Sequence, residues 1–236
     1  MRLDKLFSDC GILSRRDTAR AASRGEITVN GVAVKRADVS VKEESDVVCF
    51  RGERVRYCRF VYIMLHKPAG YISATEDGSL PVVTSLLPED IQRRGVFPSG
   101  RLDKDTTGFM LLTDDGALSH LLLSPKRHVA KKYGFTLSVP LSAGAEERFA
   151  AGVMLKEGVC KSASLSLSSD RTTGEIVLTE GRYHQIKRMM HTEGSEVLTL
   201  KRLSFADIPL DENLPEGAWR HLTNEEIEQL KKAVCK

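Results

Sequence analysis

The stretch Ser99-Gly100-Arg101-Leu102-Asp103-Lys104-Asp105-Thr106-Thr107-Gly108 decides how the rest of this sequence is interpreted. It is rich in Gly, Asp and Thr and stands between two apolar segments, which predicts a loop on a rigid scaffold, where functional side chains often lie. Two cations flank Asp103 and favour its ionised form, so the carboxylate is available as a nucleophile or base. The alternative is a capped turn in which Asp and Thr side chains satisfy local amides. Composition alone slightly favours that turn.

Apolar runs and helical spacings alternate on both sides of this loop, along residues 59–236. The run 60–65 predicts a buried strand that ends before Pro68, because proline cannot donate a hydrogen bond to a sheet. Further strands are expected at 109–113, 133–139, 163–167, 176–179 and 197–205, and helices at 117–123, 143–153, around 184–192 and from Thr223, where Glu226 completes a capping box. Many strands with few long crossovers favour an α+β fold with a mixed, mainly antiparallel sheet flanked by helices.

The first 58 residues follow a different pattern, which predicts two helices and then a small sheet. Leu3, Leu6, Phe7 and Cys10 have the spacing of one apolar helix face, which Gly11 ends. A second helix begins at Ser14, with Asp17 three residues on, and ends at Gly25. Alternating β-branched residues around Asn30-Gly31 predict a hairpin, and 39–50 a further strand. The polar stretch 51–56 is expected to be a linker, so we expect domains at 1–58 and 59–236.

Positive charge gathers in this N-terminal part. Residues 1–59 carry 13 of the 35 Lys and Arg but 9 of the 32 Asp and Glu, a balance of +4, whereas the remainder has a balance of −1. Four arginines share or adjoin one face of the second helix, namely Arg15, Arg16, Arg20 and Arg24. Such a strip is suited to successive phosphates of a nucleic acid, although most charge runs are simply solvated helix faces. We favour binding because few acidic residues stand four positions away.

Two resemblances follow from these motifs. Residues 2–50 resemble the S4 domain, a small RNA-binding fold, through Arg2-Leu3-Asp4-Lys5, Ser14-Arg15 and Ile27-Thr28-Val29-Asn30-Gly31. Gly-Arg-Leu-Asp followed by Asp-Thr-Thr-Gly resembles the signature of the RsuA-type pseudouridine synthases of ribosomal RNA. In that family the aspartate of the first motif is the nucleophile, which implies that Asp103 is catalytic. This resemblance reverses the preference for a simple turn.

Three further segments are similar to motifs of the same family. Lys131-Lys132-Tyr133 is similar to Lys-x-Tyr, and Ala130 stands where the family usually has Glu. The stretch 181–189 is similar to Gly-Arg-x-His-Gln-Ile-Arg/Lys-Arg-Met, and 65–70 to Asn-Lys-Pro-x-Gly with His66 in place of Asn. The resemblance implies that Tyr133 stacks on the target base and that Lys187 pairs with Asp103. It implies substrate contacts from Arg101, Ile186 and Arg182, beside the four arginines of the second helix, and a structural role for His184.

Composition excludes several classes of protein. No apolar run reaches the ~20 residues that cross a bilayer, and the charged start lacks a signal core, so we expect a cytoplasmic protein. The five cysteines contain no Cys-x-x-Cys pair and the histidines no ligand spacing, so neither a disulfide framework nor a metal site is expected. Isomerisation of uridine needs no cofactor. We expect a monomer that meets ribosomal RNA or a ribosomal assembly intermediate, and no membrane.

The expected function is conversion of one uridine of ribosomal RNA, in the 16S RNA of the small subunit, to pseudouridine. Three alternatives remain at this point. The chain is a synthase for large-subunit RNA, or a non-catalytic S4-type RNA-binding or ribosome-assembly protein, or a glycoside-type hydrolase of nucleosides. The last usually needs two carboxylates, for which Asp105 is the candidate partner of Asp103.

Overall fold

A computed structural model of the protein describes residues 1–43, 45–55, 57 and 59–235. The chain divides into two compact units, one of Met1–Val61 with Leu87–Val96 and the other of Tyr62–Leu86 with Phe97–Lys236. Arg56, at the end of the expected linker, and Cys58, at the expected domain boundary, lie outside the described residues. The domain boundary after residue 58 therefore stays a prediction.

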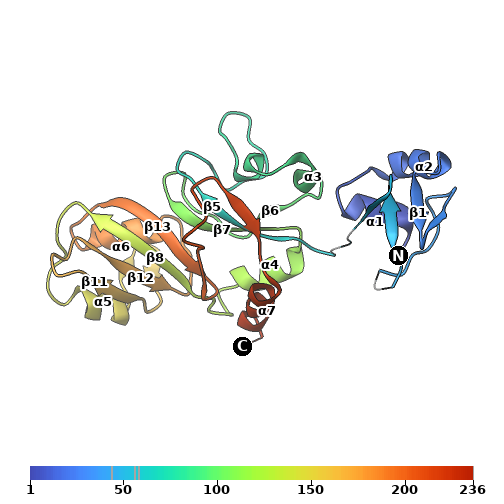
Figure 1. The fold of residues 1–236 in the computed structure, drawn as a ribbon. Coiled ribbons are helices and arrows are strands. Elements are labelled where there is room, and N and C mark those ends of the chain that lie inside the picture. The colour runs from blue at the N-terminus through green and yellow to red at the C-terminus, as the bar shows by residue number, and fades with distance from the viewer. Residues whose placement is uncertain (44, 56, 58, 236) are drawn as a thin grey trace. The chain divides into compact units, whose positions relative to one another are not determined.

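The first unit contains the two expected helices and the expected hairpin. Helices α1 (Leu3–Asp9) and α2 (Arg15–Ser23) precede a sheet of order β2-β1-β3-β4, built from β1 (Ile27–Val29), β2 (Val32–Ala33), β3 (Val48–Phe50) and β4 (Glu53–Arg54) (Figure 1). Asn30 and Gly31 both have positive φ, as the tight turn between β1 and β2 requires. The Ser14 hydroxyl accepts a hydrogen bond from the Asp17 backbone and so caps α2. Apolar side chains of both helices and of β1 and β3 form one core.

Two expectations for this unit are wrong. Of the described residues in the expected strand 39–50, those of Val48–Phe50 alone form a strand. Asp46 is the reason, since its carboxylate accepts hydrogen bonds from the Lys42 backbone and the Asn30 side chain and thereby turns the chain before β3. The expected linker 51–56 contains β4, which pairs with β3 through a turn in which Gly52 has a φ of 87°.

The second unit is built on a nine-stranded sheet, whose main path has the order β11-β12-β8-β13-β7-β5-β15. Its strands are β5 (Tyr62–Lys67), β7 (Thr107–Thr113), β8 (Lys131–Leu137), β11 (Ser164–Leu167), β12 (Thr173–Leu178), β13 (Val197–Phe205) and β15 (Trp219–His221), with β6 (Phe97–Pro98) on β7 and β14 (Ile208–Pro209) on β13. Strands β13 and β7 pair parallel, and the other neighbours on the path pair antiparallel. The expected mixed, mainly antiparallel sheet is confirmed.

Helices flank this sheet, as expected. Helix α5 (Ala145–Ala151) packs on β11, and α6 (Gln185–Thr192) packs on β13 and on the small hairpin of β9 (Met154–Leu155) and β10 (Gly158–Val159) (Figure 1). Helix α4 (Gly116–Leu123) contacts α7 (Asn224–Ala233), whose capping box of Thr223 and Glu226 is confirmed. The 3-10 helix η1 (Val83–Leu86) and the single turn α3 (Glu89–Gln92) are additions to the expected elements.

The register of the sheet brings separate motifs into one row. Tyr133 of β8 lies opposite Arg202 of β13, Arg202 opposite Gly108 of β7, and Gly108 opposite Lys67 of β5. Gly108 has a φ of 103°, and a Cβ added there would lie 2.3 Å from the Arg202 carbonyl oxygen, so the close approach of β7 and β13 requires glycine. The loop of Asp103 therefore enters the sheet at β7, which β13 separates from β8, the strand that carries Tyr133.

Among the described residues, no helix combines the length and the apolar character needed to cross a membrane.

Candidate active site

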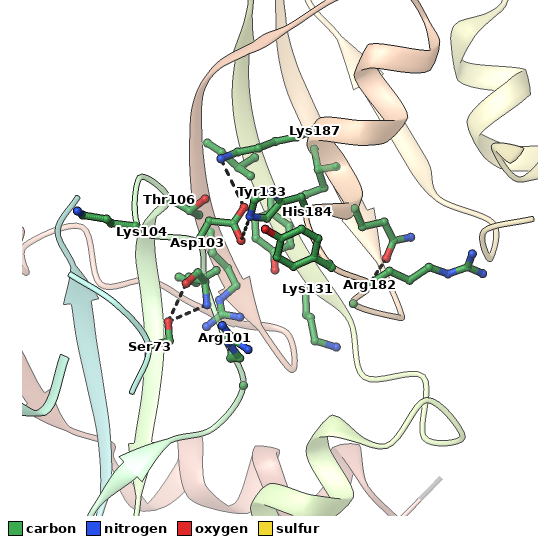
Figure 2. A pocket seen from close by; sticks show the side chains of 18 of the residues that line it. Ser73, Arg101, Asp103, Lys104, Thr106, Lys131, Tyr133, Arg182, His184 and Lys187 are labelled. Carbon is green, nitrogen blue, oxygen red and sulfur yellow. Dashed lines mark hydrogen bonds and ion pairs between the residues drawn. The ribbon is translucent and has the colours of Figure 1, made fainter. Parts of the chain in front are cut away.

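A cavity of about 940 Å³ opens in the second unit, and Tyr133 and Arg202 of the paired row line it. Figure 2 shows Tyr133 and Asp103 in this lining. Most of its lining comes from residues 72–77, the loop 100–106, the start of β8, strand β13 and the segment 180–187 that leads into α6. Asp103, Tyr133, Ile186 and Lys187 all line this cavity, although they come from separate parts of the chain. The fold thus brings the residues of three sequence motifs to one place.

The loop of Asp103 is fixed from two directions. On one side the Ser73 hydroxyl donates to the Leu102 carbonyl at 2.8 Å and accepts from the Leu102 amide at 2.9 Å. On the other side the fully buried Lys67 ammonium donates to the carbonyls of Lys104 (3.2 Å) and Thr106 (2.8 Å). Asp103 lies between these two attachments, so its backbone is held on both flanks. Lys67 is a positioning residue of this loop.

Lys67 is unusual because its side chain has no exposed surface, although it carries an ammonium group. Its burial lowers the pKa of the ammonium to about 8, against the opposite effect of the nearby Asp105 and Asp103 carboxylates. The ammonium is thus charged at neutral pH and donates to carbonyl oxygens. Sequence reasoning noted Lys67-Pro68-Ala69-Gly70 as a motif but gave the lysine no role.

Two cationic or ionisable side chains converge on Asp103, which is about one quarter exposed (Figure 2). The Lys187 Nζ lies 3.5 Å from Oδ2, and the His184 Nε2 lies 3.4 Å from Oδ1. The predicted proximity of Lys187 to Asp103 is thus present in the structure. The structural role implied for His184 stays a prediction, and the structure adds that its Nε2 faces the Asp103 carboxylate. His184 precedes α6 and has a left-handed backbone, with a φ of 47°.

Lys187 makes its shorter contacts with Asp105 rather than with Asp103. Its Nζ donates to both Asp105 oxygens, at 2.7 and 2.8 Å. Burial acts to lower the pKa of Lys187, but the hydrogen bond to Asp105 and the charges of both carboxylates outweigh it and raise the pKa. The same hydrogen bond holds the pKa of Asp105 below its usual value, against partial burial. One ammonium therefore lies within ion-pair distance of two carboxylates.

The walls of the cavity suit a flat, partly apolar ligand. Tyr133 and Ile186 are 8% and 5% exposed and contribute a phenol ring and a branched aliphatic side chain. Arg101 also lines the cavity and is exposed. A planar base between an aromatic and an aliphatic side chain matches the way proteins hold an unstacked base.

An aromatic stack extends this lining. The rings of Tyr183 and His184 are stacked, with centroids 3.8 Å apart and planes 17° apart. Tyr183 is 74% exposed, which is a large fraction for a tyrosine. Its hydroxyl makes no hydrogen bond within the described chain. Sequence reasoning passed over Tyr183, for which only its place between Arg182 and His184 gave a signal.

Arg182 has a different environment from the expected one. Its guanidinium donates to the carbonyls of Gly158 (2.8 Å) and Val159 (2.6 Å) in β10, and its Nε lies 3.5 Å from Glu180. Each guanidinium nitrogen already has a protein partner, so the structure favours a role in fixing the β9–β10 hairpin over the predicted substrate contact.

The arginines of α2 belong to the first unit and are all exposed. Arg20 lies 3.2 Å from Asp17, and Arg24 lies 4.0 Å from Glu26. These two partners stand three and two positions away, so the expected scarcity of acidic residues four positions away is not contradicted. Arg15 and Arg16 have no carboxylate within 4 Å in the described part of the chain.

Within the described ranges no three His, Cys, Asp or Glu side chains gather as a metal site would require.

Comparison with known proteins agrees with this geometry. The family model of RNA pseudouridylate synthases matches residues 61–192. An uncharacterized RNA pseudouridine synthase of Bacillus subtilis, YtzG, is 40% identical over 98% of both chains. Ribosomal small subunit pseudouridine synthase A of Escherichia coli is 38% identical over 96% of this chain and 98% of its own. A crystal structure of a pseudouridylate synthase superposes with a TM-score of 0.69 at 36% identity, over 98% of this chain and 99% of the other.

The fold and the site thus define an RNA-modifying isomerase. The chain belongs to the RNA pseudouridylate synthase family, as its resemblance to the RsuA-type enzymes implied.

Proposed function

We propose that the protein converts one specific uridine of small-subunit (16S) ribosomal RNA to pseudouridine, with Asp103 as the nucleophile. The observation that carries this proposal is the position of Asp103, in a cavity between Lys187 and His184 and beside Tyr133. The names of the relatives similar over nearly the whole chain support the small-subunit target. We also propose that the protein acts in the cytoplasm, as a monomer, on ribosomal RNA or on an assembly intermediate.

The reaction rearranges bonds within one nucleotide. The N1–C1′ bond breaks, a C5–C1′ bond forms, C5 loses its hydrogen as a proton and N1 gains one, so that no atom is gained or lost. The target base must leave the helical stack to reach Asp103, as in other enzymes that act on bases. Tyr133 supplies an aromatic surface for this base, and Ile186 an aliphatic one. No cofactor is needed for this balance.

Lys187 and the contacts of the loop hold the Asp103 carboxylate in position for nucleophilic attack. A carboxylate in a partly buried cavity loses nucleophilicity if it protonates, and a nearby cation opposes protonation. The Lys187 ammonium is 3.5 Å away, while its short hydrogen bonds go to Asp105, so the Asp103 oxygens stay available. The Asp103 carboxylate then attacks C1′, attacks C6 or abstracts the 2′ proton. Each of these three steps can start the isomerisation.

The first unit is proposed to bind RNA as an S4-type domain at residues 1–58, with the catalytic domain at 59–236. Exposed Arg15 and Arg16 on α2 have no acidic partner among the described residues and suit phosphate contacts. Arg20 and Arg24 belong to the same face and reach carboxylates only at the distances of surface ion pairs, which are weak. Arg101, beside Asp103, is proposed to contact the RNA at the cavity.

Incubation of unmodified small- and large-subunit ribosomal RNA with the pure protein tests this function, with Asp103→Asn as the control. Carbodiimide labelling and reverse-transcription stops locate any pseudouridine. A single new stop in small-subunit RNA, with the wild type only, is the expected result. A stop only in large-subunit RNA overturns the choice of target. Tight binding without a stop in either RNA, or in partly assembled particles, favours the non-catalytic RNA-binding alternative.

A further inference from the structure

Two cations, Lys131 and Arg202, line the same cavity as Asp103 and have no carboxylate partner in the described residues. Lys131 is the first residue of β8, two positions before Tyr133, and Arg202 lies directly opposite Tyr133 on β13. Residues two apart on a strand share a face, and so do paired residues on neighbouring strands. The two cations therefore flank the aromatic ring of Tyr133. Figure 2 shows Lys131 in the cavity lining with Tyr133 and Asp103.

The contacts of the two cations are with neutral groups. Lys131 donates to the Val129 carbonyl at 3.0 Å, and the Arg202 Nε donates to the Phe109 carbonyl at 2.5 Å with an Nη 3.9 Å from the Met110 sulfur. Both also approach the Phe205 ring, at 5.7 Å and 5.3 Å from its centroid. An ammonium has three donor hydrogens and a guanidinium five, so most of these donors have no protein acceptor.

Without an RNA ligand, these two unpaired charges lower the stability of the folded protein. Arg202 is only 2% exposed, and buried charges in proteins are normally paired. Burial lowers the pKa of Lys131 to about 8, and the charges of Arg202 and Lys161 add to this effect. A buried guanidinium and a partly buried ammonium thus lie beside the cavity without an anionic partner among the described residues.

We propose that Lys131 and Arg202 bind a phosphate group of the RNA backbone next to the target uridine. This inference rests on the proposed function, since it takes the base to lie on Tyr133. A nucleotide in that position brings its own backbone alongside the ring, where the two cations lie. A guanidinium and an ammonium together match a phosphate, because the former binds two oxygens in one plane and the latter binds as a point charge. The site thereby holds the flipped nucleotide by its backbone as well as by its base.

A neutral backbone tests this assignment. The RNA fragment that the protein converts is prepared with the native phosphodiester, or with an uncharged methylphosphonate, on either side of the target uridine. Dissociation constants are measured with the wild type and with Lys131→Met, which removes the charge and keeps the length. The matched control is Lys132→Met, since Lys132 lies on the opposite face of β8 and pairs with Glu175 at 2.5 Å. Lys131 carries the test because Arg202 also supports the fold.

We expect one of the two methylphosphonates to weaken wild-type binding about tenfold, as for loss of a charge-assisted hydrogen bond. The same change should have a clearly smaller effect in Lys131→Met, where Arg202 alone remains to bind the phosphate, and the full effect in Lys132→Met. Equal losses in the wild type and Lys131→Met, or no loss in the wild type, would overturn the proposal. Binding of inorganic phosphate that depends on Lys131, without any methylphosphonate effect, would overturn it in favour of a free-anion site. Failure of the native fragment to be converted would instead count against the proposed function.

Discussion

The Nζ atom of Lys187 lies 3.5 Å from Oδ2 of Asp103, although the first residue belongs to α6 and the second to the loop before β7. The two charged groups are thus within the distance of an ion pair. Its short hydrogen bonds, however, are made with Asp105, so it does not occupy the oxygens of Asp103. This division is what a nucleophilic carboxylate in a partly buried cavity requires.

Replacement of Lys187 by Met should lower kcat by on the order of tenfold or more, because the variant leaves the Asp103 and Asp105 carboxylates without the ammonium that both face. The dissociation constant for RNA should change much less. Both quantities are measured with Lys104→Met as the control, since Lys104 is an exposed cation of the same loop whose side chain makes no ion pair among the described residues. An unchanged kcat in Lys187→Met would contradict the role given to this lysine.

Asp105→Asn separates the proposed isomerase from a hydrolase that uses two carboxylates. In the isomerase Asp105 only shares the Lys187 ammonium, so kcat should stay within about fivefold of the wild type, a change of ~1 kcal/mol in the barrier. A glycoside-type hydrolase would lose its activity with either carboxylate. The RNA products are analysed for pseudouridine and for released uracil. Free uracil, abolished by Asp105→Asn, would support the hydrolase instead.

Tyr183 should contribute an RNA contact through its ring. Its stack on His184 leaves most of the side chain exposed at the cavity, and stacking of a base on an aromatic ring is worth ~1–3 kcal/mol. Tyr183→Ala should therefore weaken RNA binding about tenfold, while Tyr183→Phe, which keeps the ring, should bind as the wild type does. Equal losses in both variants, measured by titration of labelled RNA, would show that the hydroxyl and not the ring matters.

Lys131→Met should stabilise the free protein while it weakens function. The pKa of Lys131 is about 8 in the folded chain, below the ordinary value of 10.5, so at pH 7 the folded state contains a buried charge that the unfolded state solvates. Removing it should raise the free energy of unfolding by on the order of 2 kcal/mol. As pH rises through about 8, the folded wild type releases this proton and gains stability until the unfolded value is reached, so the advantage of Met should shrink. Denaturant unfolding at pH 7 and pH 10 measures this, and a constant difference would contradict it.

Local patterns predicted most of the fold. The caps at Ser14 and Thr223, the Asn30-Gly31 turn and the alternating strands of the large sheet all depend on residues near in sequence, and the structure contains them. The short elements were not predictable in this way. Strand β4 forms because β3 offers it a free edge, and β9 and β10 pair with each other over a few residues, so neither has a periodicity of its own.

The residues of the candidate site also fall into those that the sequence predicted and those that it did not. Motif resemblance identified Asp103, Tyr133 and Lys187, and the structure places all three in one cavity. The sequence did not predict the contacts that depend on how the strands pair. The hydrogen bonds of Lys67 to the loop and the position of Arg202 opposite Tyr133 follow from the order of strands, which no single stretch of sequence specifies.

The most direct test of the central claim, that the Asp103 carboxylate drives the isomerisation, is release of tritium from ribosomal RNA labelled at C5 of uridine. C5 loses its hydrogen only when it bonds to C1′, so released tritium counts completed rearrangements. The wild type should release tritium up to the amount present at a single uridine, and Asp103→Asn should release none while it still binds the RNA. Release by Asp103→Asn at the wild-type rate would contradict the account.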